Sequence, residues 1–100
     1  MTVSEAKNVI YSEHNAPFGR LLIATSVLAT KNYAGEVTIK DLLECLRRGY
    51  VHGKTTAVAE LAALALYERT GRKRNTTIPY EDFDVNPESW ESYLREHNDS

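Results

Sequence analysis

The sequence predicts an all-α fold, a bundle of about five helices packed around a central apolar helix at residues 57–67. Apolar residues recur at spacings of three, four and seven along most of the chain, and the alternating pattern of strands is scarce. Residues 57–67 are apolar on nearly every side of a helix, and such a helix is normally surrounded by others. With 100 residues, 42% of them hydrophobic, we expect one domain with one core.

Two helices are predicted in the first third of the chain. Thr2 and Glu5 have the spacing of a capping box, which starts a helix that extends to Glu13. The break at residues 15–17 starts a second helix, which we expect from about Ala16 to Tyr33, with Gly35 after its end. Its buried stripe is expected to comprise Phe18, Leu21, Leu22, Thr25, Leu28, Ala29 and Asn32, widened by Ile23 and Val27.

The third and fourth helices follow from the same kinds of signal. Thr38, with Asp41 three residues on, starts a helix that either Gly49 or Gly53 ends. The central helix begins near Ala57 and stops before Gly71. Leu61 and Leu64 lie on different sides of this helix, and because it is apolar all round we expect both to be buried.

The last helix follows an irregular connection at residues 72–86. Asn86 and Pro87 supply an N-cap and a first-turn proline. Trp90 shares a stripe with Tyr93, Leu94 and His97, and we expect it to be the anchor of this helix in the core.

No catalytic, cofactor or metal site is legible. Residues 49–56 contain the Gly-Lys-Thr of a phosphate-binding loop, but three residues separate the glycines where that motif has four, and the preceding segment is predicted to be a helix. No two histidines lie three or four residues apart, so no metal ligands are predicted. Cys45 is expected to be a buried structural residue rather than a nucleophile.

The charge is strongly divided along the chain. The net charge is −2, yet residues 47–74 carry seven basic and two acidic residues, whereas residues 75–100 carry one basic and seven acidic. Two alternatives stay open: the acidic tail neutralises the basic middle, or the two patches are solvated separately. The candidate anion-binding residues in the basic part are Arg47, Arg48, Lys54, Arg72, Lys73 and Arg74.

An acidic, aromatic segment is the candidate protein-binding site. Its residues are Tyr80, Glu81, Asp82, Phe83 and Asp84, in a run of carboxylates that we expect to be solvated. Aromatic rings supply contact area at interfaces, and carboxylates steer a basic partner. The alternative is that the rings fasten the loop to the core.

These features favour a small, acidic, non-enzymatic protein-binding module of pI about 5.9, acting as a regulator, adaptor or stoichiometric inhibitor. The alternative is a helical protein that contacts the phosphate backbone of nucleic acid through residues 47–74, which the acidic tail disfavours. We expect a protein partner, with a homo-oligomer as one possibility, and no cofactor. One cysteine, no leader and no long apolar run predict a cytoplasmic protein without membrane contact.

Overall fold

The computed structural model describes residues 1–30, 35–51, 56–73 and 84–97, and within these ranges the chain forms five helices and no β-strand. The helices are α1 (Val3–Ser12), α2 (Phe18–Thr30), α3 (Ile39–Gly49), α4 (Ala57–Thr70) and α5 (Pro87–His97). The predicted all-α class is confirmed. None of these helices is long and apolar enough to cross a bilayer.

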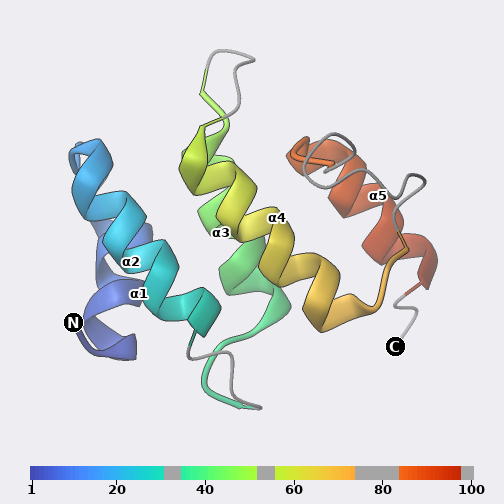
Figure 1. Ribbon diagram of the computed structural model, residues 1–100, viewed down its shortest axis with the longest axis horizontal. Coiled ribbons are helices and arrows are strands. Elements are labelled where there is room, and N and C mark those ends of the chain that lie inside the picture. Colours follow the sequence, from blue (N-terminus) through green and yellow to red (C-terminus); the bar gives the residue numbers. More distant parts are fainter. Residues whose placement is uncertain (31–34, 52–55, 74–83, 98–100) are drawn as a thin grey trace.

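The helices are arranged with α3 and α4 in the middle of the molecule (Figure 1). The pair α1 and α2 lies on one side of them and α5 on the other. α4 packs against α3 and α2, while α1 also reaches α3, and α5 contacts α3. The core is therefore built where α3 and α4 meet the flanking helices.

The helix ends follow the local chemistry of the sequence. Thr2 and Glu5 form a capping box on α1, and Thr38 and Asp41 form one on α3, so that side chains satisfy the free amides of each first turn. α4 ends at Gly71, whose φ of +74° is left-handed and suits glycine. These predicted boundaries are confirmed, although α4 continues to Thr70 rather than Tyr67.

α2 begins two residues later than predicted. The carbonyl of Pro17 accepts the first helical hydrogen bonds, from the amides of Arg20 and Leu21, so the proline precedes the first turn and does not occupy it. At the other end, residues 31–34, including Asn32, lie outside the described residues.

The inner side of α4 combines four alanines with larger apolar residues. Val58, Ala59, Ala62, Ala63, Ala65, Leu66 and Tyr67 are all buried. The prediction that Leu61 and Leu64 are both buried is wrong for Leu64, which is 38% exposed, and Leu61 is half-buried. Glu60 and Glu68, four residues before and after Leu64, are exposed on the same face of α4. No helix of the described chain covers this face.

The predicted stripe of α2 is wrong at two positions. Phe18 and Ile23 are 52% and 56% exposed, whereas Ala24, Thr25 and Leu28 form the fully covered face. The reason is that α1, α3 and α4 all pack on one side of α2. Its opposite side carries the exposed Ile23 and has no covering helix within the described chain.

Candidate functional site

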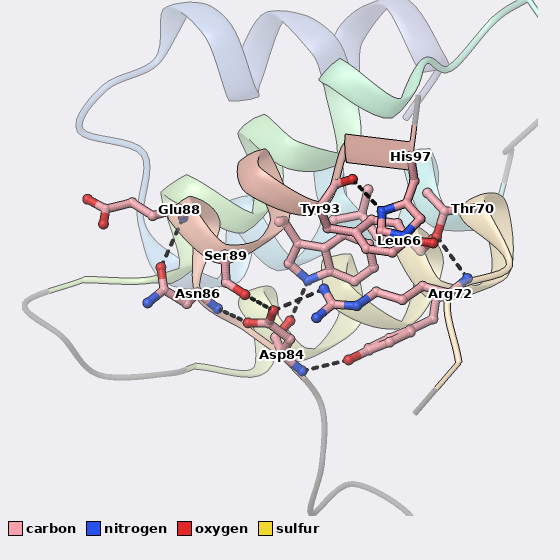
Figure 2. Close-up of polar contacts among 11 residues, drawn as sticks. Leu66, Thr70, Arg72, Asp84, Asn86, Glu88, Ser89, Tyr93 and His97 are labelled. Atoms are coloured by element: carbon pink, nitrogen blue, oxygen red, sulfur yellow. Dashed lines mark hydrogen bonds and ion pairs between the residues drawn. The ribbon is translucent and has the colours of Figure 1, made fainter. Parts of the chain in front are cut away.

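Asp84 is a structural anchor and not a solvated carboxylate. Its side chain lies 3.0 Å from the Arg72 guanidinium and accepts hydrogen bonds from the hydroxyl of Ser89 and the amide of Asn86 (Figure 2). Its own amide donates to the hydroxyl of Tyr67, and its carbonyl accepts from the indole N–H of Trp90. The expectation of a solvated acidic run is therefore wrong at this residue, because a partner twelve residues away draws it inward.

Arg72 is held against the same cluster. Its guanidinium carbon lies 4.6 Å from the ring centre of Trp90 and 4.8 Å from that of Tyr93. The Trp90 ring is fully buried and meets Tyr67 edge to face at 4.9 Å, which confirms it as the core anchor of α5. The cation–π contacts and the ion pair with Asp84 together hold Arg72 between the end of α4 and α5.

Arg48 also binds within the chain, to backbone carbonyls. Its guanidinium donates to the carbonyls of Val9, Ile10 and Glu13 at 3.3, 2.6 and 2.7 Å. These carbonyls belong to the last turn and C-cap of α1. The Val9 carbonyl also accepts the Glu13 amide, and the Glu13 carbonyl also accepts the Ala16 amide. Arg48 thus caps α1 from α3.

Arg47 forms ion pairs with two carboxylates. It binds Glu44 within α3 at 2.8 Å and Glu91 of α5. The basic middle and the acidic tail therefore neutralise each other at two described pairs, Arg47–Glu91 and Arg72–Asp84, which favours the first of the two alternatives for the divided charge.

The remaining candidates are mostly beyond the described ranges. Lys54, Arg74 and the segment Tyr80, Glu81, Asp82 and Phe83 lie outside the described residues, and Lys73 is exposed. In the described part of the chain, the candidate anion-binding residues do not gather around a common point. Three of them, Arg47, Arg48 and Arg72, bind carboxylates or carbonyls of the protein itself. Gly49 is the last residue of α3, whereas a phosphate-binding loop follows a strand; residues 52–55 of that motif lie outside the described residues.

Cys45 and Asp41 are two further buried residues outside these clusters. Cys45 is fully buried, and burial raises the pKa of its thiol to about 12, so the thiolate that a nucleophile requires does not form near neutral pH. Asp41 accepts hydrogen bonds from Tyr11 at 2.6 Å and from the Thr38 amide at 2.9 Å, and it pairs with Lys7 at 3.3 Å. In the described part of the chain, no three His, Cys, Asp or Glu side chains gather as metal ligands would.

The feature that sequence reasoning missed is the uncovered side of α2. An open depression of about 410 Å³ lies there, lined by Leu22, Ile23, Ser26, Val27 and Thr30. We call these residues, with the exposed Gly19 one turn before Ile23, the α2 outer face. A signal for it existed: residues 21–30 contain no charged residue, although a helix packed on one side only normally has charges on the other.

Two other depressions are less suited to binding. One of about 530 Å³ lies between α3 and α5, beside the Arg47–Glu91 pair. A smaller one of about 200 Å³ includes Arg69, which donates to the carbonyl of Val37, and His97, which stacks on Tyr93. Their polar groups contact the chain itself, whereas the α2 outer face presents side chains for which the described chain provides no cover.

Comparison of this chain with protein-family models, with curated proteins and with solved structures finds no match.

Proposed function

We propose that this protein is a non-enzymatic protein-binding module, a regulator, adaptor or stoichiometric inhibitor, and that its docking surface is the α2 outer face. The observation that carries the proposal is Ile23, an aliphatic side chain that is 56% exposed at the middle of a helix face without charge. Such faces are typical of interfaces, whose centres are depleted in charged residues.

The hydrophobic effect favours covering this face. Each Å² of apolar surface removed from water contributes about 25 cal/mol, so covering Ile23 with the flanking Leu22 and Val27 favours association. Scattered exposed aliphatics are common in proteins, but here Ile23 lies with the half-buried Leu22 and Val27 around one depression.

Two further observations support protein binding over the other function classes. Cys45 is buried with a raised pKa, which does not fit a nucleophile. Arg47, Arg48 and Arg72 bind groups of the chain itself, so phosphate contacts would compete with existing ion pairs and hydrogen bonds. The acidic, aromatic segment at residues 80–83 stays a separate prediction.

A photo-crosslinking amino acid placed at Ile23 tests this function in the native host. We expect protein adducts of the chain when the crosslinker replaces Ile23. The matched control replaces Val51, a β-branched residue that is 46% exposed and follows the C-cap of α3, and should give few adducts. Absence of any protein adduct from position 23 would contradict the proposed function.

A further inference from the structure

We infer that residues 84–97, which we call the α5 latch, open as one unit from a folded body of α1–α4, and that the surface beneath them binds an acidic helix carrying a tryptophan. This inference is independent of the α2 outer face, because α5 lies on the other side of α3 and α4 from α1 and α2 (Figure 1). In the closed molecule the occupant of that surface is α5 itself.

The helices α1–α4 form a connected core without α5. α1 packs on α2 and α3, and α4 packs on the same two helices. α3 and α4 bury six and seven of their residues, whereas α5 buries only Trp90. Elements with few buried apolar contacts open at a lower free energy than the core of the same protein. Among the described helices, α5 is therefore the one whose opening disturbs the body least.

The latch also has polar contacts of its own that tie its first residues to its helix. Asp84 accepts hydrogen bonds from the hydroxyl of Ser89 and the amide of Asn86 (Figure 2). Its carbonyl accepts from the indole N–H of Trp90, and the side chain of Asn86 accepts from the amide of Glu88. Because these bonds lie within residues 84–90, this part of the chain docks and leaves together.

One aromatic side chain anchors the latch on the body. The Trp90 ring is fully buried, meets the Tyr67 ring of α4 edge to face at 4.9 Å, and lies 4.6 Å from the guanidinium carbon of Arg72. The hydroxyl of Tyr67 also accepts a hydrogen bond from the Asp84 amide. A helix that inserts a large aromatic residue is a common form of peptide ligand. α5 thus contacts the body as such a ligand would.

Two ion pairs flank the anchor, and both join the acidic latch to arginines of the body. Asp84 pairs with Arg72, and Glu91 pairs with Arg47 of α3. The latch contains four carboxylates and one arginine. All four side chains of the two pairs are partly exposed, so salt screens their attraction. Closure of the latch therefore depends on ionic strength.

Opening would leave a surface whose ligand chemistry is defined by α5. The Tyr67 ring would lose the tryptophan that covers it. Arg47 and Arg72 would lose one carboxylate partner each. A second helix with a tryptophan and neighbouring carboxylates would restore the same contacts. A free helix of 11 residues is marginal in water, so the latch loses its helix on opening and a ligand gains one on binding.

Amide hydrogen exchange of the whole chain, followed by NMR, tests the opening. The slowest amides of α5 should exchange at least about tenfold faster than those of α4, because only the latch has to open. Raising the salt from about 20 mM to about 500 mM should speed exchange in α5 severalfold and leave α4 unchanged. Amides of α5 that exchange as slowly as those of α4 would overturn the latch, as would a salt effect shared equally by both helices.

Glu91→Gln tests the contribution of an ion pair, because it removes the charge that binds Arg47. Exchange in α5 should become about two- to fivefold faster, and its response to salt should be smaller. Glu96→Gln is the matched control, since it removes the same charge at an exposed position of the same helix. This control should behave as the parent chain does. Equal exchange in the two variants would overturn the role of the ion pair in closure.

A fluorescently labelled synthetic peptide of residues 84–97 tests the surface beneath the latch. The peptide competes with α5 of the whole chain, so its apparent affinity rises with the open fraction. The Glu91→Gln chain should therefore bind the peptide about two- to fivefold more tightly than the parent or the Glu96→Gln chain, measured by anisotropy. No binding to the Glu91→Gln chain at up to about 1 mM, or equal binding to all three chains, would overturn the site.

A second peptide tests the aromatic anchor without any change to the protein. The peptide with Trp90→Ala should bind the Glu91→Gln chain about tenfold or more weakly than the parent peptide, because it lacks the ring that packs on Tyr67. Equal binding of the two peptides would show that charge alone attracts them, and would overturn the tryptophan as the feature that the surface recognises.

Discussion

At the scale of single residues, Gly49 allows α3 and α4 to pack closely. It is the last residue of α3, and a Cβ built there would lie 2.4 Å from the amide nitrogen of Ala59. That atom belongs to the backbone of α4 and cannot move aside as a flexible side chain would. The carbonyl of Gly49 also accepts a hydrogen bond from Thr56, the N-cap of α4, at 2.7 Å.

We therefore expect Gly49→Ala to destabilise the protein by about 3 kcal/mol or more, since the two helices would have to separate. Gly19→Ala is the matched control, because a Cβ there meets nothing within 4 Å, and it should leave stability unchanged or raise it by up to about 1 kcal/mol. Urea unfolding measures both. A cost below about 1 kcal/mol for Gly49→Ala would contradict this close approach.

At the scale of elements, Arg48 links two helices that are distant in the sequence. Its planar guanidinium reaches three carbonyls at the end of α1, which a lysine ammonium with a single nitrogen cannot reproduce. Arg47, its neighbour in α3, is exposed, and its ion pairs lie at the surface. The two arginines therefore differ in what they contribute to stability.

Arg48→Lys should cost about 1–3 kcal/mol of unfolding free energy, the range for hydrogen bonds to charged groups and their unpaired acceptors. Arg47→Lys should cost no more than about 1 kcal/mol, because surface ion pairs contribute little. Chemical denaturation of the two single variants compares them directly. Equal losses would show that Arg48 does not act as the cap of α1.

Helix ends could be predicted from the sequence and helix faces only in part. Thr2, Thr38 and Gly71 act through neighbours within a few residues, so their spacing carries the information. Which side of an apolar helix is covered depends on distant elements. For that reason the exposure of Ile23 and Leu64 was not predicted.

The candidate site shows the same limit. The aromatic and acidic composition around Asp84 is visible in the sequence, but its pairing with Arg72 is a tertiary contact. Arg48 likewise looks like any basic residue until α1 is placed beside α3. The charge pattern of the sequence allowed the basic and acidic regions to neutralise each other, but only the fold shows which residues pair.

At the scale of the whole molecule, acid should weaken the packing of α1 against α3 through Asp41. Burial by itself raises the pKa of this carboxyl, but hydrogen bonds from the Thr38 amide, Tyr11 and Lys7 outweigh it, and the pKa is lowered. A group whose folded pKa is lowered stabilises the fold above its unfolded pKa of about 3.9. That stability is lost as the pH falls through the folded value.

We expect the unfolding free energy to decline below about pH 4, with part of the decline removed in Asp41→Asn. The variant should also be less stable than the parent chain at pH 7. Glu36→Gln, which removes an exposed carboxylate, serves as the control and should retain the parent's decline. An Asp41→Asn protein with the parent's full acid sensitivity would show that this carboxyl does not link α1 to α3.

The central claim is that the α2 outer face is the docking surface, and photo-crosslinking from position 23 in the native host tests it most directly. We expect protein adducts when the crosslinker replaces Ile23, and few when it replaces the exposed Val51. No protein adduct from position 23, or equal adducts from the two positions, would contradict the claim.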